Sequence, residues 1–477
     1  IGRQRFGIQS QGEWNTARGE QNALLRPYSF FDNEVFHEWG DSTDVYFNRL
    51  GLFFRTDDSA DVNAQDLRRA ATARGIRWSS LFQPGANSRL GAYVQFRELT
   101  LTDAEASDRD RQSITSRLQY RQFFWRKSIQ STSFYESGIS SEPLRSFSYI
   151  RVPDGTGLYT WVDYNDNGVQ ELNEFELAQL PGQGNYVRVF VPGRNFQQAG
   201  RTLLTQNLGF TPRLLLKNNA ARPFWSRWAV QWNYSLENLN ILDGTSNPLD
   251  PFYVPANDSL KVALRKSNRV TLFFNRTQLA FGGDYSFLDQ RNEQLQTYGP
   301  ERSEIQTHRL TLRFQLAEQF NLSPVAEIGF KELSTPGFLQ RNYRLDLQEF
   351  RLQMSWQISM SINLSAVSSW KRSVNTLESG EQLEAFSQRL NAQYSLGGQS
   401  NLNAGVDIRA NDFTGSAFSP VGFEMLQGLL PGNNYLWNVY WEKQFFDFLQ
   451  FNLRYDGRSS PGTEVIHTAS MQVKALF

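Results

Sequence analysis

The feature that most constrains this chain is an alternation of polar and apolar residues with a period of two. From Leu402 to Ala410 every second residue is apolar, and the residues between them are polar or glycine. The same alternation recurs in 309–316, 451–456 and 465–477. A β-strand points successive side chains to opposite faces, whereas a helix would scatter each apolar set around its circumference. The pattern therefore predicts half-buried strands.

Alternation alone allows two architectures. In a soluble sandwich the apolar face lines a core, whereas in a membrane barrel it meets lipid and the polar face lines the lumen. The mean hydropathy is −0.51, and no window approaches the ~20 apolar residues that a membrane helix requires. Yet aromatic residues make up 14% of the chain, with 37 Phe, 18 Tyr and 12 Trp. Aromatic girdles at both membrane interfaces are typical of a transmembrane β-barrel, which is therefore the predicted class.

The lengths of the strands and links support the membrane barrel. The expected strands span roughly 11–16 residues, against a usual mode of about 5–6 in globular proteins. Short turns, expected to be periplasmic, are predicted near 84–87, 125–127, 217–222, 317–319, 357–359, 396–399 and 446–448. Longer links, expected to be extracellular, are predicted near 57–68, 142–199, 242–258, 290–301, 334–340, 375–381 and 414–431.

This spacing predicts an all-β, antiparallel transmembrane barrel of about eighteen strands (range 16–20) between Val45 and Phe477, and an even number is usual for single-chain bacterial barrels. A change of phase between Leu347 and Phe350 predicts a β-bulge.

The domain assignment is a barrel over 44–477 with an extracellular insertion at 142–199. Residues 1–43 fit the pattern poorly, and we expect a plug, a linker or the tail of an upstream domain, although 3–14 could form a strand. The chain opens at Ile1 without a signal peptide, which we interpret as a processed chain or a piece of a longer protein.

One motif in the insertion carries specific chemistry. Residues 163–174 read DYNDNGVQELNE and match the calcium-loop pattern D-x-[DN]-x-[DN]-G-x5-E at every fixed position. Calcium takes six to eight oxygen ligands, and a glycine at position 6 permits the sharp turn. Gly168 holds that position. The predicted ligands are Asp163, Asn165, Asn167, the carbonyl of Val169, Glu171 and Glu174.

The flanks of this motif match only part of an EF-hand. Residues 172–180 suit a short exiting helix, whereas the entry at 158–161 has the pattern of a strand or turn. We therefore expect an EF-hand-like loop that binds Ca²⁺ and rigidifies a long external link. The alternative interpretation is an Asn/Asp/Gly turn held by its own side-chain hydrogen bonds.

Residues 159–176 (YTWVDYNDNGVQELNEFE), followed by 185–190 (NYVRVF), resemble a segment of large, poorly characterised outer-membrane proteins of Bacteroidota-type bacteria. The specific match covers about residues 148–192, and the rest of the barrel is similar only as a class. The resemblance implies an outer-membrane setting and a longer precursor with upstream domains. It implies no known activity.

Several function classes are disfavoured by composition. The absence of cysteine excludes disulfides, thiolate metal sites and a cysteine nucleophile. With 48 basic and 48 acidic residues, no net charge points to nucleic acid. Of the three histidines, His308 and His467 fall in the lipid-facing register, where a headgroup interface is the expected setting. No zinc-protease, P-loop or nucleophile-elbow motif occurs, so we expect no catalytic residues and no enzyme activity.

Two further sets of residues have alternative interpretations. Aromatics in the outward register are either a membrane girdle or sugar-stacking platforms, and the girdle is favoured: Trp228, Trp232, Tyr234, Trp356, Trp370, Tyr435, Trp437 and Trp441. Charges in the lumen register are either a selectivity ladder or a salt-bridged network, and their mixed signs favour the network: Arg309, Arg313, Arg351, Arg389, Arg409 and Arg454 with Glu327, Asp407, Glu442 and Asp456.

Two functions follow from this fold. The first is a channel or transporter for small polar solutes, because a barrel of 16–18 strands leaves an aqueous lumen unless it is plugged. The second is a non-enzymatic binding or scaffolding subunit of a multi-protein outer-membrane complex. The expected location is the bacterial outer membrane and the expected cofactor is Ca²⁺. The expected partners are outer-membrane lipids and, for the second function, other outer-membrane proteins or lipoproteins.

Overall fold

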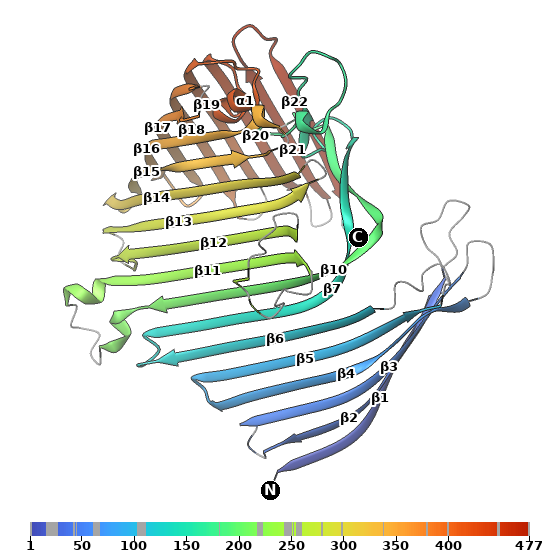
Figure 1. The fold of residues 1–477 in the computed structure, drawn as a ribbon. Coiled ribbons are helices and arrows are strands. Elements are labelled where there is room, and N and C mark those ends of the chain that lie inside the picture. The colour runs from blue at the N-terminus through green and yellow to red at the C-terminus, as the bar shows by residue number, and fades with distance from the viewer. Residues whose placement is uncertain are drawn as a thin grey trace. The chain divides into compact units, whose positions relative to one another are not determined.

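The computed structural model describes residues 2–15, 27–41, 43, 45–60, 67–102, 111–180, 182–216, 223–242, 250, 252–253, 260–277, 280–296, 299–336, 338–377, 380–397, 400–445 and 449–475. In these residues, 22 strands belong to one sheet, and consecutive strands pair antiparallel along most of the chain (Figure 1). The predicted all-β, antiparallel class is therefore confirmed. Across the same ranges, no helix has the length and apolar character needed to cross a membrane.

The first strands are β1 (Arg3–Asn15), β2 (Tyr28–Gly40), β3 (Tyr46–Ala60), β4 (Leu67–Gly85), β5 (Ser88–Leu101), β6 (Arg111–Phe124), β7 (Ile129–Arg151), β8 (Tyr159–Trp161), β9 (Phe175–Leu177), β10 (Tyr186–Phe210) and β11 (Trp228–Ile241). The remaining strands are β12 (Lys261–Phe274), β13 (Phe281–Gln296), β14 (Gly299–Ala317), β15 (Phe320–Ser334), β16 (Tyr343–Gln357), β17 (Ile362–Asn375), β18 (Gln382–Leu396), β19 (Ser400–Thr414), β20 (Gly432–Phe445), β21 (Leu449–Ser459) and β22 (Ile466–Ala475). The helical segments are η2 (Leu172–Glu174), η3 (Pro212–Leu215), η4 (Phe224–Arg227), η6 (Leu339–Arg341) and α1 (Pro420–Leu426).

The number of long strands agrees with the pattern of alternation. Among the strands of the described residues, only β8 and β9 are as short as three residues. Leaving these two aside, eighteen long strands lie between β3 and β22 in the described part of the chain, which is the number predicted after Val45.

Residues 1–43 contribute two more strands. β1 pairs with β2 and β2 with β3 in continuous register, so this segment extends the sheet and no break in pairing separates it from residues 44–477. Its alternation is hidden because aromatic residues occupy both faces of β2. Phe36 is only 6% exposed and lies 3.9 Å from the Arg49 guanidinium, whereas its neighbour Val35 is 59% exposed on the opposite face.

The structure divides into two compact units by its contacts, and we describe each by itself. Unit 1 comprises Ile1–Leu144, Gly193–Asn219 and Gln231–Ser267. One face of its sheet carries a cross-strand row of exposed apolar side chains: Ile8, Val35, Leu52, Ile76 and Phe96. On the other face, Glu34 forms ion pairs with Arg49 at 3.2 Å and with Arg77 at 3.5 Å. The two faces of unit 1 therefore differ sharply in polarity.

Unit 2 comprises Arg145–Pro192, Ala220–Val230 and Asn268–Phe477. Its strands β13 to β22 pair consecutively (Figure 1). An apolar row crosses five of these strands on one face: Met354, Ala366, Leu390, Val406 and Trp437. A polar row crosses four of them on the other face: Arg351, Ser369, Ser387 and Arg409. We call these the apolar face and the polar face of unit 2.

Helix α1 packs on the polar face. Ser419 caps its N-terminus by accepting a hydrogen bond from the Gly422 amide at 3.0 Å. The main buried apolar cluster forms under the helix: Tyr343, Leu345, Leu383, Val421, Met425 and Leu426. The core of unit 2 is therefore a local one, at the end of the strands that α1 covers.

The predicted bulge between Leu347 and Phe350 is wrong. β16 pairs with both β15 and β17 through these residues without any shift of register. The phase changes because the apolar residues change face: Tyr343 and Leu345 pack beneath α1 on the polar face, whereas Phe350 lies exposed on the apolar face. In the described residues, register irregularities fall instead between Asp57 and Asp58, between Phe82 and Gly85, and between Gln315 and Ala317.

The observed strands end and begin within a few residues of six predicted links: 84–87, 125–127, 317–319, 357–359, 375–381 and 414–431. The long link predicted at 290–301 is wrong, because β13 runs to Gln296 and β14 starts at Gly299. The alternation does not reveal these strand ends, because polar side chains occupy both faces there. An ion pair from Arg302 of β14 to Glu293 of β13, at 3.7 Å, joins the two strands. The links predicted at 217–222 and 446–448, most of the link at 242–258 and half of the link at 57–68 lie outside the described residues.

Candidate functional site

The predicted calcium loop connects β8 and β9. These short strands pair with each other, so Trp161 lies opposite Phe175, and Tyr159 of β8 also pairs with Tyr186 of β10. Strand pairing therefore holds the two ends of the loop together. The extended entry at 158–161 is confirmed by β8, but the predicted exit helix is wrong, because the chain makes only the single turn η2 before it pairs with β8 as β9.

The loop winds around its own side chains. The Asp163 carboxylate accepts hydrogen bonds from the amides of Asn167 at 3.2 Å and Gly168 at 2.8 Å. The Asn167 side chain in turn accepts one from the Val169 amide at 2.6 Å. Gly168 has a φ of +71°, a conformation that glycine adopts without steric cost, which explains a glycine at this position. These contacts agree with the turn-like interpretation and also bring the side chains at the predicted positions around one bend.

Glu174 closes the loop from inside. Its side chain is 0% exposed, and its carboxylate accepts hydrogen bonds from Trp161 Nε1 at 2.8 Å and from the amides of Tyr164 and Glu171, each at 3.3 Å. A buried carboxylate is costly unless such donors surround it. Asn165 Nδ2 donates to Glu171 Oε2 at 3.0 Å, which links the middle of the loop to its end.

Hydrogen bonds within the loop therefore connect all six predicted ligand residues, five of them through their side chains and Val169 through its backbone amide. Over the ranges that the structure describes, no three His, Cys, Asp or Glu side chains converge into a metal-binding group. A cation here would instead be held by carboxylate, amide and backbone oxygens together. That mixed oxygen set is the kind that suits Ca²⁺.

An aromatic cluster of Tyr149, Phe175 and Tyr186, which sequence reasoning missed, packs beside the strands at which the loop begins and ends. The Phe175 ring is buried, stacks on Tyr149 with a centroid distance of 4.0 Å, and meets the edge of Tyr186 at 5.0 Å. Phe175 lies in a strand of three residues, too short to show alternation, so its place in this cluster was not predicted.

An ion pair ties the insertion to the link between β15 and β16. Arg341 Nη2 lies 3.4 Å from Glu176 Oε1, and the Tyr164 hydroxyl donates to the same carboxylate oxygen at 3.3 Å. Burial raises the pKa of the Glu176 carboxyl to about 7, although the Arg341 charge acts to lower it. Burial, together with the charge of Glu176, also raises the pKa of the Tyr164 hydroxyl well above its usual range. The insertion is therefore anchored by a buried polar group.

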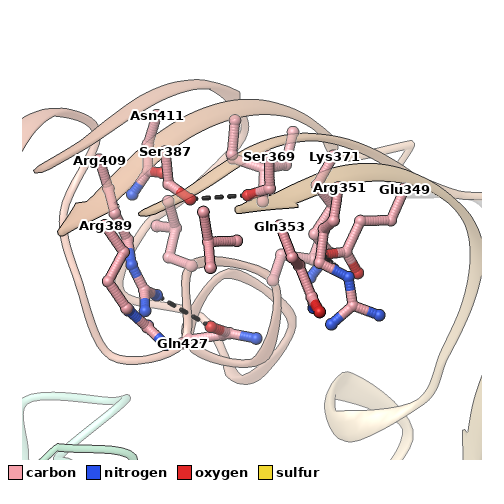
Figure 2. Close-up of a pocket in the computed structure, with 15 residues that line it drawn as sticks. Glu349, Arg351, Gln353, Ser369, Lys371, Ser387, Arg389, Arg409, Asn411 and Gln427 are labelled. Atoms are coloured by element: carbon pink, nitrogen blue, oxygen red, sulfur yellow. Dashed lines mark hydrogen bonds and ion pairs between the residues drawn. The ribbon is translucent and has the colours of Figure 1, made fainter. Parts of the chain in front are cut away.

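A second candidate site is a cavity of about 260 Å³ between α1 and the polar face, which we call the α1 pocket (Figure 2). Strands β16 to β19 supply its wall in cross-strand rows: Glu349, Lys371, Ala385 and Asn411; Arg351, Ser369, Ser387 and Arg409; Gln353, Val367 and Arg389. Leu383 of β18 and the residues Met425, Leu426 and Gln427 at the end of α1 complete it.

Three arginines predicted in the lumen register line this pocket, and their predicted acidic partners neutralise part of their charge. Arg389 and Arg409 approach Asp407 Oδ2 at 2.7 and 2.9 Å. Arg351 lies 3.2 Å from Glu327, which also pairs with Arg309 at 2.7 Å. The salt-bridged network interpretation is therefore supported by these ion pairs. Lys371, Ser369 and Ser387 were not singled out, because only the position of α1 distinguishes them from other polar residues of the same register.

The two histidines of unit 2, His308 and His467, each lie beside aromatic side chains. The His308 ring lies 4.9 Å from Phe287, and its Nδ1 lies 2.7 Å from the Tyr285 hydroxyl. The Nδ1 of His467 lies 2.8 Å from the Tyr455 hydroxyl. Both therefore sit among aromatic side chains.

No family model matches this chain, and neither does any curated protein. Solved structures give distant matches. The copper transporter OprC is 9% identical, with 99% of this chain and 75% of that chain covered and a TM-score of 0.40. The ferric yersiniabactin uptake receptor FyuA of Yersinia pestis is 9% identical over 99% and 72%, with a TM-score of 0.38. The ferric-catecholate import receptor Fiu of E. coli is 10% identical over 98% and 73%, with a TM-score of 0.37.

Proposed function

We propose that this chain spans the bacterial outer membrane as a β-barrel and acts as a channel or transporter for small polar solutes. The observation that supports the proposal most strongly is the polarity of the two faces of the sheet. Apolar rows run across neighbouring strands on one face, and Leu390 and Val406 in one of these rows are 61% and 46% exposed. Arg–Glu and Arg–Asp pairs occupy the other face.

A continuous apolar surface of this kind is unfavourable in water, because each exposed aliphatic or aromatic side chain forgoes roughly 1.5–3 kcal/mol of burial. Contact with lipid hydrocarbon removes that penalty, and outer-membrane lipids are therefore the partners that this face fits. The polar face, by contrast, suits an enclosed aqueous space. Solutes that cross such a space must be polar and small, since arginine and carboxylate side chains project into it.

In this proposal the insertion lies outside the cell and its loop at 163–174 binds Ca²⁺. The positive φ of Gly168 and the hydrogen bonds that link Asp163, Asn165, Asn167, Glu171 and Glu174 around one turn support the assignment. Calcium concentrations outside cells saturate even a weak site with a dissociation constant of about 10⁻⁴–10⁻³ M. The bound ion would join the two arms of the loop that the β8–β9 pairing already brings together.

The test is reconstitution of the purified chain into planar lipid bilayers. Stable stepwise conductance is expected, because an aqueous passage through a rigid barrel opens a constant cross-section to ions. A chain that stays folded and monodisperse in buffer without any amphiphile would contradict the membrane assignment. A chain that inserts into lipid but conducts nothing would contradict the channel.

The second candidate is a non-enzymatic binding or scaffolding subunit of a larger outer-membrane assembly. The packing of α1 against the polar face favours it, because a helix over this face narrows any passage beside it. Isolation of the native protein in mild detergent distinguishes the two. Stoichiometric co-purification of other outer-membrane proteins or lipoproteins, together with silence in bilayers, is the result expected of a scaffold.

A further inference from the structure

The α1 pocket has an excess of positive charge. Five cationic side chains line or adjoin it: Arg309, Arg351, Lys371, Arg389 and Arg409. Three acidic side chains face them: Glu327, Glu349 and Asp407. Two positive charges therefore remain without an acidic counterpart in this cluster. A network that served only to stiffen the wall would be expected to balance its charges.

Lys371 carries much of this excess. It lies opposite Glu349 in the register between β16 and β17, but that carboxylate is 3.2 Å from the Arg351 guanidinium. Within the part of the chain that the structure describes, no hydrogen bond or ion pair engages the Lys371 ammonium. The ammonium group therefore lines the cavity with all its hydrogen-bond donors available (Figure 2).

The rest of the lining complements a small organic anion. Ser369 and Ser387, whose hydroxyl oxygens are 2.6 Å apart, lie at the centre of the wall between the two cationic edges (Figure 2). Val367, Leu383 and Met425 supply an apolar side. Arg409 donates to the Gln427 side chain at 3.1 Å and so holds the end of α1 over the cavity. A volume of about 260 Å³ admits a solute of about the size of a substituted ring.

We propose that the α1 pocket is a binding site for a small organic anion, a carboxylate or phosphate joined to a short apolar group. Guanidinium groups bind such oxyanions through paired, charge-assisted hydrogen bonds, and an ammonium group adds a point charge. The anion would take the position between Lys371 and the guanidinium groups of Arg351, Arg389 and Arg409. Its apolar part would contact the end of α1. This inference concerns binding alone and does not depend on conduction through the barrel.

The experiment is titration calorimetry of the full chain in detergent micelles at low salt, with phenyl phosphate as the probe. Inorganic phosphate tests the charge alone and phenol tests the ring alone. We expect saturable binding of phenyl phosphate, weaker binding of phosphate and none of phenol. Lys371→Met should weaken phenyl phosphate binding about tenfold or more, because it removes a charged hydrogen-bond donor. Lys371→Arg should retain binding.

Two variants keep this test decisive. Lys443→Met removes the same charge from the apolar face of β20, so it is the matched control and should bind as the unaltered chain does. Ser387→Leu fills the pocket without changing its charge and should abolish binding. The proposal is overturned if the unaltered chain shows no saturable binding up to about 10 mM probe, a range in which even weak sites register. It is equally overturned if Lys371→Met and Ser387→Leu both bind like the unaltered chain.

Discussion

At the scale of single residues, several of the less exposed charges have partners on the same or a neighbouring strand, or within the same loop. Asp407 accepts from two arginines, and Glu174 accepts from one indole and two amides. In such arrangements the loss of one partner leaves the other desolvated, which costs more than the pair itself contributes. Substitutions at these positions are therefore informative about local stability.

The pair between Arg341 and Glu176 gives the first prediction. Arg341→Leu should destabilise the insertion by up to about 3–5 kcal/mol at pH values well above 7, where Glu176 would be charged and buried without its counter-charge. Adding Glu176→Gln should recover much of this loss by removing the isolated charge. Native-state hydrogen exchange of the amides in 159–177 measures both effects. Equal protection in the single and double variants would show that the ion pair does not anchor the insertion.

The calcium loop gives the second prediction. Asp163→Ala combined with Glu174→Ala should abolish calcium binding and make 142–199 more sensitive to protease, since both ends of the predicted ligand set are lost. Asp166→Asn is the matched control: it removes one negative charge at a position outside the ligand pattern, and asparagine tolerates the φ of +55° found there. Calcium titration followed by limited proteolysis, with and without a chelator, measures both effects. Protease resistance that a chelator leaves unchanged in the unaltered chain would contradict the calcium assignment.

At the scale of elements, the strands were predictable and the segments between them only in part. Period-two alternation identified long strands wherever one face was apolar and the other polar, as in β19 and β22. It failed in β2 and at the facing ends of β13 and β14, where both faces carry similar side chains. Helix α1 has seven residues, too few to show a helical period, so 414–431 was predicted only as a link. The pocket beneath α1 could not be predicted for the same reason.

The packing of α1 gives the third prediction. Met425 is buried against the strands, so Met425→Ala should loosen the helix by about 2–5 kcal/mol through lost burial and a residual cavity. Phe418→Ala in the same link is the control, because Phe418 is 72% exposed and its truncation removes little contact. Protease cleavage within 415–431 should increase only for Met425→Ala. Increased cleavage in both variants would mean that the link as a whole, and not the helix contact, was disturbed.

At the scale of the whole molecule, the decisive property is the environment of the apolar face. Leu390→Arg should cost about 2–4 kcal/mol in a lipid bilayer if that residue lies near the membrane midplane, whereas a water-exposed arginine would cost almost nothing. Asn391→Arg places the same side chain on the adjacent, polar-face position and should be nearly neutral. The free energy of folding into phospholipid vesicles measures both. Equal values for the two variants would contradict the proposed orientation of the sheet.

The α1 pocket draws every one of its strand residues from odd-numbered positions of β16 to β19, while the apolar row uses even-numbered positions of the same strands. Alternate positions of the same strands therefore determine two separate properties, the lining of the pocket and the character of the apolar face. Substitutions at the odd-numbered positions alone could change the ligand preference of the pocket, while the apolar residues at the even-numbered positions stay the same. Ligand specificity could therefore evolve without any change in the residues of the apolar face.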